Sequence, residues 1–334
     1  MPDFRNICEQ VKNGVAIDRR TACEIARYAD PHSLWAAADA VRRDFTGDQF
    51  HLCSIINARS GNCSENCRFC AQSARYQTGA PAYALIDDKE AMTIALDNDA
   101  HSVHRLSLVT SGHSVDAESL DQLIGLYAQI RKQTDMGFCA SMGFLDQERA
   151  ERLRAAGVSR YHCNLETNKQ RFAEVCTTHT WQEKVDTLQI AAETGMSVCS
   201  GGIIGMGETM NDRIELALEL RQLGVKSIPI NILTPISGTP FAELEPLPVQ
   251  EVLTTIALFR FIKPDAVIRI AGGRQQLGAD QYCCFAAGAN GAIVGNYLTT
   301  TGSSVAEDLA ALREMGFTVA QPCSVNSESP VISG

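Results

Sequence analysis

The stretch Cys63-Ser-Glu-Asn-Cys67-Arg-Phe-Cys70 places three thiols in one short segment of the 334-residue chain. Three thiolates at this spacing can hold a metal centre and leave a fourth coordination position for a small molecule. A closed zinc site is disfavoured, because His51 and His101 fall outside the usual finger spacing. A disulfide framework is also disfavoured, because three neighbouring cysteines cannot all pair with one another. The segment therefore predicts an open metal site.

One apolar, β-like run precedes this segment, and others follow along the chain. The runs cover residues 51–57, 103–109, 136–142, 158–165, 196–203, 226–233, 266–271 and 291–295. Helical patterns separate most of them, so the alternation predicts an α/β fold, a (β/α)8 TIM-type barrel. The three cysteines then lie in the loop after the first strand, at the C-terminal mouth of the barrel, where such barrels hold their active sites.

Three of the intervening helices have readable ends. Thr180-Trp-Gln-Glu183 is a capping box that starts one helix, and Gly195 stops it. A second helix covers about residues 116–133, and a third lies between Pro248 and Pro264.

The domain organisation follows from these patterns. Residues 1–50 are expected to form extra helices outside the barrel, and residues 51–320 to form the barrel itself. The tail at residues 321–334 is polar and lacks periodicity, so it is expected to be flexible. No Pro- or Ser-rich linker divides the chain, which favours one large domain.

Composition favours a cytoplasmic enzyme. The chain is 45% hydrophobic and 20% charged, and neither a signal peptide nor a membrane span is visible in it. Its thirteen cysteines indicate metal or redox chemistry rather than a disulfide scaffold. The formal net charge of -10 argues against nucleic acid as a partner, because phosphate binding requires a basic surface.

With Phe69 placed before the third cysteine, the Cys-x3-Cys-x2-Cys segment resembles that of the radical S-adenosylmethionine enzymes. The resemblance implies that Cys63, Cys67 and Cys70 bind a [4Fe-4S] cluster. In these enzymes the unique iron of the cluster binds S-adenosylmethionine, and reduction cleaves that molecule to a 5'-deoxyadenosyl radical. An electron donor of the flavodoxin or ferredoxin type is implied as well.

Longer stretches between about Leu52 and Thr301 resemble the biotin synthase family. They are Cys70-Ala-Gln-Ser-Ala-Arg-Tyr-Gln-Thr-Gly79, Tyr161-His-Cys-Asn-Leu-Glu-Thr167, Val198-Cys-Ser-Gly-Gly-Ile-Ile-Gly-Met-Gly-Glu-Thr209, Pro229-Ile-Asn-Ile-Leu233 and Ala286-Ala-Gly-Ala-Asn-Gly291. The resemblance implies radical insertion of sulfur into dethiobiotin to form biotin, with the sulfur taken from an auxiliary iron–sulfur cluster. A homodimer and service by the iron–sulfur assembly machinery are implied too.

By position, Cys139, Cys199 and Arg269 match the family's ligands of the auxiliary cluster, deep in the barrel. Ser107 stands where the family has a third auxiliary cysteine. Serine is a hard ligand and suits an iron–sulfur centre less well than a thiolate does. Three interpretations stay open: Ser107 ligates a [2Fe-2S] cluster, another cysteine replaces it, or the site holds a cluster of a different type.

Other residues bear on these interpretations. Strand alternation turns Cys163 away from the barrel interior, whereas Cys283 and Cys284 are candidate substitutes for Ser107. Cys199 alone could be a small core side chain, and Arg269 could pair with an acid or a cluster sulfide.

Four residues are candidates for binding small molecules. Asn164 and Glu166, two apart on one predicted strand, share a face on which an amide and a carboxylate can bind ribose hydroxyls. The family commonly has Asp in place of Glu166. Lys184 falls where some relatives have an arginine for the methionine carboxylate, and its alternative is a solvated helix residue. Asn231 matches a family residue near the ureido ring of dethiobiotin, and its alternative is a strand cap.

The glycine-rich segment at residues 201–208 permits close backbone approach to adenine, and by itself it also resembles a phosphate loop. The histidines at positions 101, 104, 113 and 179 have no ligand-like spacing, so they are expected to be structural or at the surface.

Two other functions stay open at this level. A different radical enzyme on the same barrel, related to hydrogenase maturases or methylornithine synthase, would share the cysteine segment but act on another substrate. A non-catalytic iron–sulfur electron carrier or sensor would bind iron without cleaving S-adenosylmethionine.

Overall fold

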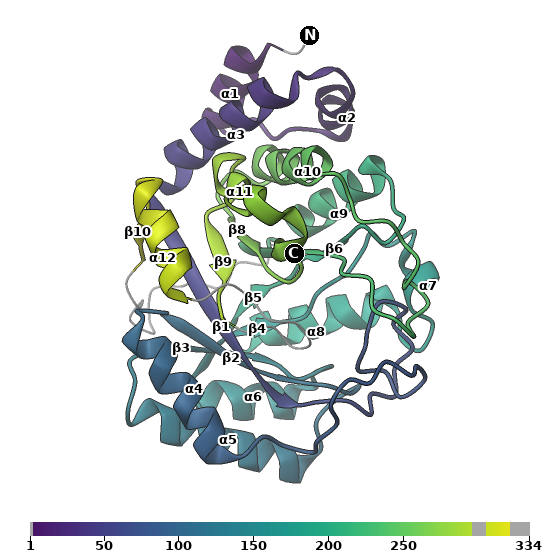
Figure 1. Ribbon diagram of the computed structural model, residues 1–334, viewed down its shortest axis with the longest axis vertical. Helices are drawn as coiled ribbons and strands as arrows, with labels where there is room; N and C mark the ends of the chain where they lie inside the picture. The colour runs from purple at the N-terminus through teal and green to yellow at the C-terminus, as the bar shows by residue number, and fades with distance from the viewer. Residues whose placement is uncertain (1–2, 296–304, 321–334) are drawn as a thin grey trace.

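The computed structural model describes residues 3–295 and 305–320, whose parallel strands close into a barrel (Figure 1). The strands are β1 (Gln49–Arg59), β2 (Arg105–Thr110), β3 (Gly137–Ser141), β4 (Val158–His162), β5 (Ser197–Cys199), β6 (Gly202–Ile204), β7 (Ser227–Ile232), β8 (Val267–Ile270) and β9 (Gly291–Ile293). Strand β9 pairs with β1, which closes the barrel. Because β5 and β6 both pair with β7, they share one position, and the predicted (β/α)8 barrel is confirmed.

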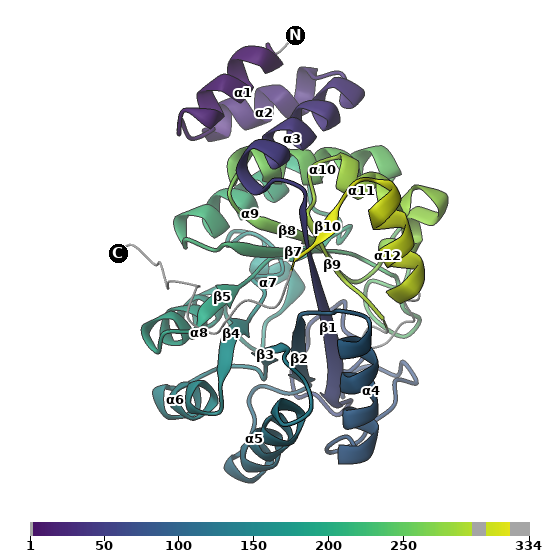
Figure 2. The same ribbon diagram turned by 90° about the vertical axis from the view of Figure 1, so that its left-hand side faces the viewer.

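Helices cover the outside of the barrel (Figure 2). They are α4 (Asp88–Ala100), α5 (Ala117–Arg131), α6 (Gln147–Ala155), α8 (Trp181–Glu193), α9 (Met210–Gln222), α10 (Val249–Ile262), α11 (Cys283–Ala286) and α12 (Val305–Glu314). The short helix α7 (Phe172–Val175) lies instead in the connection between β4 and α8, where the Val175 carbonyl accepts a hydrogen bond from the Arg68 N–H of the cysteine loop. Parallel neighbours need crossover connections, and helices between consecutive strands supply them here.

The predicted helix ends are confirmed. The Thr180 hydroxyl accepts a hydrogen bond from the Glu183 backbone N–H, while the Glu183 carboxylate accepts one from the Thr180 N–H at 2.7 Å, so both halves of the capping box form at the start of α8. Asp116 caps α5 by accepting a hydrogen bond from the Ser119 N–H at 2.8 Å. Helix α10 begins directly after Pro248.

Three further helices precede the barrel, and this confirms the extra N-terminal helices of the predicted fold. They are α1 (Phe4–Lys12), α2 (Arg19–Tyr28) and α3 (Pro31–Thr46), and each begins after an aspartate whose carboxylate accepts backbone hydrogen bonds. They lie together at one end of the molecule, next to α9 and α10 (Figures 1 and 2). Phe4 stacks on Phe261 of α10, with 6.2 Å between the ring centroids. This end lies away from the cysteine loop, which follows the far end of β1.

The last strand and the helix after β8 were not predicted. Strand β10 (Thr318–Val319) pairs in parallel with the start of β1, and the 3-10 helix η1 (Arg274–Tyr282) follows β8. A two-residue strand carries no periodicity, and η1 is polar and kinked at Gly278. The expected tail at residues 321–334 lies outside the described residues. Among the helices of residues 3–295 and 305–320, none combines the length and the apolar character needed to cross a membrane.

Side chains along β1 alternate between two faces. Phe50, Leu52 and Ile56 are buried in the main apolar core, whereas Cys53 and Ile55 line a cavity inside the barrel. The same alternation in the other strands points a second set of side chains into this interior. These inward side chains form the site described next.

Candidate active site

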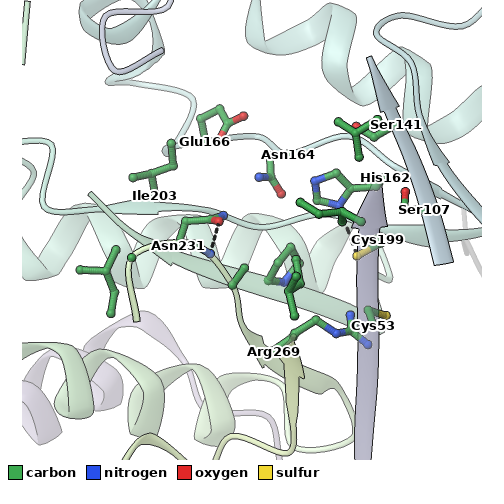
Figure 3. A pocket seen from close by; sticks show the side chains of 18 of the residues that line it. Cys53, Ser107, Ser141, His162, Asn164, Glu166, Cys199, Ile203, Asn231 and Arg269 are labelled. Carbon is green, nitrogen blue, oxygen red and sulfur yellow. Dashed lines mark hydrogen bonds between the residues drawn. The ribbon is translucent and has the colours of Figure 1, made fainter. Parts of the chain in front are cut away.

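A cavity of about 350 Å³ lies inside the barrel, lined from every barrel strand (Figure 3). Its polar and sulfur-containing lining consists of Cys53, Ser54, Cys70, Gln72, Ser107, Cys139, Ser141, Arg160, His162, Asn164, Glu166, Cys199, Asn231, Thr234 and Arg269. The cavity therefore connects the cysteine loop at the mouth with a group of thiols and arginines deeper in the barrel.

The loop that carries Cys63, Cys67 and Cys70 is fixed by its own hydrogen bonds. The Cys63 N–H donates to the Gln72 carbonyl at 3.0 Å, and the Cys63 carbonyl accepts from the Ala74 N–H at 2.8 Å. The Gln72 side chain also accepts a hydrogen bond from the Gly61 N–H at 3.1 Å. Of the three predicted ligands, Cys70 lines the cavity, Cys63 is buried and Cys67 is half-buried. The closed loop holds the thiols in place before any metal binds.

A group that sequence reasoning missed lies beside this loop. Ligand atoms of Cys67, Cys176 and His179 all lie within 4.8 Å of one another, and the two Sγ atoms are 3.7 Å apart. The His179 Nδ1 atom lies 3.4 Å from the Cys176 Sγ and 2.6 Å from the Glu65 Oε2. The hydrogen bond between the thiols raises the pKa of Cys67 and lowers that of Cys176. The expectation that His179 has no ligand-like neighbours is wrong, because a loop 109 residues from Cys67 folds back onto it.

Deeper in the cavity lie Ser107, Cys139, Cys199 and Arg269. Ser107 on β2 is in register with Cys139 on β3. Across the barrel, the Ser227 hydroxyl accepts a hydrogen bond from Arg269 Nη1 at 2.7 Å and donates one to the Cys199 Sγ at 3.2 Å. The fold therefore brings together the four residues that the resemblance selected, although they come from four different strands.

Basic side chains lie next to the deep thiols. The His162 Nδ1 atom lies 3.4 Å from the Cys199 Sγ, and Arg105 Nη1 donates to the Cys139 Sγ at 3.8 Å. Burial opposes ionisation of Cys199, but His162 and Arg269 outweigh it and lower the pKa of this thiol to about 6. At Cys139 burial dominates and raises the pKa. The site therefore favours negative charge at Cys199.

Asn164 and Glu166 do not lie on one strand as predicted, because β4 ends at His162. Both side chains nevertheless line the cavity (Figure 3). Glu166 has φ of 68°, a conformation that is uncommon outside glycine and that clusters at functional sites. Its N–H donates to the Gly201 carbonyl at 3.1 Å and its carbonyl accepts from the Ile203 N–H at 2.9 Å, which fixes this turn.

The Glu166 side chain is half-buried at the cavity wall, and its Oε2 atom is buried. Within the described part of the chain its Oε2 atom has no hydrogen-bond partner. Burial raises the pKa of this carboxyl, although nearby Lys184 opposes the shift. A buried, unpartnered carboxylate oxygen fits a ligand with hydroxyl donors.

Lys184 on α8 is buried, so the solvated alternative for this residue is wrong. Its ammonium lies 5.8 Å from the centroid of the Phe144 ring. Burial alone would lower the pKa of Lys184, but Cys163 and Glu166 raise it above its ordinary value, and the side chain stays a cation. Periodicity on α8 did not predict this, because the loops at the barrel mouth cover the face of the helix that carries Lys184.

Asn231 on β7 lines the cavity and also holds two neighbouring segments together. Its amide donates to the Gly202 carbonyl at 3.3 Å and accepts from the Gly272 N–H at 3.0 Å. The strand-cap alternative thus describes part of its role. The remaining N–H and lone pair of the carboxamide are left for another partner.

The glycine-rich segment after β5 is not a phosphate loop. The Glu208 carboxylate accepts hydrogen bonds from the Gly205 and Met206 N–H groups, both at 2.7 Å. It also accepts from Arg213 Nε at 2.6 Å. The backbone amides that a phosphate would need are therefore engaged by a carboxylate of the protein itself.

The candidate substitutes for Ser107 do not reach the cavity. Cys163 and Cys284 are buried in the apolar core, and Cys283 is exposed. This confirms that Cys163 faces away from the interior, and it shows that the interpretation of Cys283 and Cys284 as substitutes is wrong. Among the cysteines of the described residues, those that line the cavity are Cys53, Cys70, Cys139 and Cys199.

Comparison with known proteins identifies the family. Residues 58–220 match the Radical SAM superfamily, and residues 229–318 match the Biotin and Thiamin Synthesis associated domain. The chain is 50% identical over 314 residues to the biotin synthase of Desulfotalea psychrophila, covering 93% of this chain and 94% of that protein. The chain belongs to the biotin synthase family. A second member, from Acetivibrio thermocellus, is 47% identical over 319 residues, covering 95% of this chain and 100% of its own length.

Solved structures share the barrel of this biotin synthase family member. Methylornithine synthase superposes with a TM-score of 0.81 at 18% identity, over 95% of this chain and 98% of that one. The FeFe-hydrogenase maturase of Carboxydothermus hydrogenoformans gives 0.79 at 17% identity, over 94% and 78%. At such identities the likeness shows the fold alone. The sequence relatives, which are much more similar, place the chain among the biotin synthases. The chain is therefore a radical enzyme and not an electron carrier.

As a biotin synthase family member, the chain uses a [4Fe-4S] cluster, S-adenosylmethionine and an auxiliary iron–sulfur cluster. The residues present fit these groups. Among residues 3–295 and 305–320, the Ser107 hydroxyl and the Nε and Nη2 atoms of Arg269 are buried without hydrogen-bond partners. Buried polar atoms are normally paired, so these atoms fit a polar group bound between the strands.

Sequence reasoning missed several residues that line the site of this biotin synthase family member. Among them are Cys53 on β1 and Arg160 and His162 on β4. Period-two alternation was the available signal, because Arg160 and His162 precede Asn164 by four and two residues, and Cys53 precedes the inward Ile55 by two.

Proposed function

We propose that this chain inserts sulfur into dethiobiotin to form biotin. One observation carries the proposal: in a member of the biotin synthase family, one cavity is lined by Cys70 at its mouth and by Cys139, Cys199 and Arg269 in its depth. A small substrate between these two ends is within reach of both metal sites. This arrangement suits a reaction that needs a radical from one side and sulfur from the other.

In this proposal Cys63, Cys67 and Cys70 hold the [4Fe-4S] cluster, and Cys139, Cys199 and Arg269 belong to the auxiliary site, with Ser107 at its edge. When bound, the clusters supply the electron that cleaves S-adenosylmethionine and the sulfur that enters the product. The chain itself supplies position and the exclusion of water.

Three side chains are proposed to bind S-adenosylmethionine. The Glu166 carboxylate accepts hydrogen bonds from ribose hydroxyls, supported by its unpartnered Oε2 atom. Asn164 lies next to it and is oriented by a hydrogen bond from the Gly201 N–H to its Oδ1 atom at 3.0 Å. The Lys184 ammonium offers a positive charge to the methionine carboxylate.

Asn231 is proposed to hold the ureido ring of dethiobiotin. Its contacts to Gly202 and Gly272 fix the orientation of the carboxamide. The free N–H and lone pair then match the carbonyl and N–H of a cyclic urea. Apolar side chains of Ile55 and Ile203 line the same cavity and keep water from the reacting carbons.

We also propose partners that follow from this reaction. They are an electron donor of the flavodoxin or ferredoxin type, the iron–sulfur assembly machinery and a second copy of the chain in a homodimer. A cytoplasmic location fits the many free thiols at the described cysteine positions.

The test is an anaerobic assay of reconstituted protein with dethiobiotin, S-adenosylmethionine and a reductant. Biotin and 5'-deoxyadenosine are measured by mass spectrometry, and Mössbauer spectra are recorded before and after turnover. Biotin with loss of one iron–sulfur signal is the expected result. Deoxyadenosine without biotin would keep the radical chemistry and reject dethiobiotin, and neither product would reject the proposed function.

A further inference from the structure

Cys53 occupies an inward position on β1 that sequence reasoning did not use. Its neighbours Leu52 and Ile56 are buried in the apolar core, whereas Cys53 is half-buried and lines the cavity with Ile55. The residue is therefore a thiol presented to the interior of the barrel, not a small core side chain.

Along the barrel axis, the strand register places Cys53 between Ser107 and Cys139 on one side and Arg269 on the other. Two residues further along β1, Ile55 pairs with Ser107, which pairs with Cys139. Two residues earlier, His51 pairs with Gly291, which pairs with Arg269. Successive residues rise about 3.3 Å along a strand, and every second side chain points inward. Cys53 is therefore one inward-facing residue away from the height of Ser107 and Cys139, and one away from the height of Arg269.

Arg269 provides a second observation. Figure 3 shows its guanidinium pointing toward Cys53, from a strand that only β9 separates from β1. The Ser227 hydroxyl links the same guanidinium to Cys199, because it accepts a hydrogen bond from Arg269 Nη1 at 2.7 Å and donates one to the Cys199 Sγ at 3.2 Å. The same guanidinium carries two buried N–H groups, at Nε and Nη2, that have no partner within the described residues. Arg269 therefore lies next to Cys53, is linked to Cys199 through Ser227, and still has donors to offer.

The charge of the lining fits a strongly anionic occupant. Arg160, His162 and Arg269 line the cavity together with these thiols. Of the described residues that line it, Glu166 is the acidic one, and it belongs to the cysteine-loop end. Three thiolates with bridging sulfides supply the negative charge that this end of the cavity favours.

The choice between Cys53 and Ser107 follows from ligand chemistry. Iron in iron–sulfur centres prefers thiolate, whereas a serine hydroxyl keeps its proton and is a hard ligand. Cys53 and Ser107 lie on the neighbouring strands β1 and β2. Ser107 pairs with Cys139 on β3, so Cys53 and Ser107 both lie in the part of the cavity that holds Cys139. One thiol is missing at position 107, and one is present at position 53.

We propose that Cys53 supplies the third thiolate of the auxiliary cluster, with Cys139 and Cys199, and that Ser107 lines this site without ligating iron. The inference rests on the proposed function, which places a cluster here. On binding, Cys53 releases its proton to solvent and its thiolate donates an electron pair to iron, with no change of oxidation state. Arg269 remains beside the three thiolates and offers its free N–H groups to the bound cluster.

The experiment isolates the auxiliary cluster in the full-length chain. In a parent variant with Cys63, Cys67 and Cys70 all replaced by Ala, any remaining iron–sulfur centre is the auxiliary one. Cys53→Ala, Cys53→Ser and Ser107→Ala are added singly, and each protein is reconstituted anaerobically. Iron, acid-labile sulfide and visible absorption are measured per chain. Cys163→Ala is the matched control, because this buried cysteine faces away from the cavity.

Cys53→Ala is expected to lower the affinity of the auxiliary site for iron by at least about tenfold, since even the loss of a residue that only orients a metal ligand costs this much. Ser107→Ala and Cys163→Ala are expected to keep the iron content of the parent. Circular dichroism of Cys53→Ser, which preserves the size of the side chain, separates ligand loss from misfolding. Retention of iron by both Cys53 variants, or an equal loss in Ser107→Ala, would overturn the inference.

The result separates this inference from the proposed function. If Cys53→Ala loses the cluster but the wild-type protein makes no biotin, the inference stands and the proposed function fails. If the wild-type protein makes biotin while the Cys53 variants keep their iron, the inference alone fails. A parent that holds no iron would reject both the thiolate set and the proposed source of sulfur.

Discussion

The Sγ atom of Cys176 lies 3.7 Å from the Sγ atom of Cys67, within hydrogen-bond distance for two thiols. With His179, these two thiols form the group of ligand atoms that could hold a single metal ion. The same Cys67 is a proposed ligand of the [4Fe-4S] cluster. The single-ion group and the proposed cluster ligands thus share Cys67. Substituting a residue that belongs to only one of the two sets shows which set binds the metal.

Cys70→Ala is expected to abolish reductive cleavage of S-adenosylmethionine, because it removes a thiolate that no other cysteine of the loop can replace. Cys176→Ala is expected to retain at least about half of the iron and of the cleavage activity, since Cys176 is outside the proposed set. Iron content and 5'-deoxyadenosine are measured in both. The reverse pattern, with iron lost in Cys176→Ala and kept in Cys70→Ala, would assign the metal to Cys67, Cys176 and His179.

Glu166→Gln is expected to weaken binding of S-adenosylmethionine by about 10- to 100-fold, the effect of losing a hydrogen bond to a charged group. Glu166→Asp keeps the carboxylate and tolerates the left-handed backbone at this position, so this variant is expected to lose less affinity for S-adenosylmethionine. Equilibrium binding to the reconstituted enzyme checks both values. Equal affinity in Glu166→Gln and the wild-type protein would remove this carboxylate from the binding site.

Gly201→Ala is expected to destabilise the protein by about 3 kcal/mol, the upper end for overpacking. An added Cβ would lie 1.9 Å from the Pro229 carbonyl oxygen, and the strands would have to separate. Gly125→Ala is the control, because Gly125 lies on the exposed side of α5 with no atom within 4 Å of an added Cβ. This change is expected to stabilise by about 0.5–1 kcal/mol. Urea unfolding measures both, and similar stabilities for the two variants would contradict the role given to Gly201.

The half-buried Glu219 of α9 predicts a dependence of stability on pH. Burial, and the neighbouring Glu215, raise the pKa of Glu219 to about 7 in the folded chain from an ordinary 4.5. Between these two values the folded state binds more protons than the unfolded state, so stability falls as pH rises and then levels off. Because Glu219 is partly solvated, the effect is expected to be about 1 kcal/mol.

Glu219→Gln removes this titration. The variant is expected to match the wild-type protein near about pH 4 and to be more stable at about pH 8, as judged by unfolding midpoints in urea. Glu193→Gln, at an exposed position on α8, serves as control. A constant difference between Glu219→Gln and the wild-type protein across this range would show that Glu219 does not titrate as stated.

Much of the fold was predictable because its signals are local. The apolar runs that became β1 to β9 are periodic over a few residues, and the capping box at Thr180 operates within one helical turn. The resemblance then selected Cys139, Cys199 and Arg269, which the barrel places in one cavity. The prediction that Asn164 and Glu166 share a strand was wrong, because β4 stops at His162 and the backbone turns at Glu166.

The sequence by itself determined the barrel, the cysteine loop and the family, since spacing and periodicity are properties of the chain over short distances. Only the tertiary structure decided that Cys176 lies against Cys67, that Lys184 is buried and that Cys53 faces the same cavity as Cys199. These relationships depend on strand register and on how loops cover the barrel mouth. Both are set by packing between segments far apart in the chain, which no local pattern encodes.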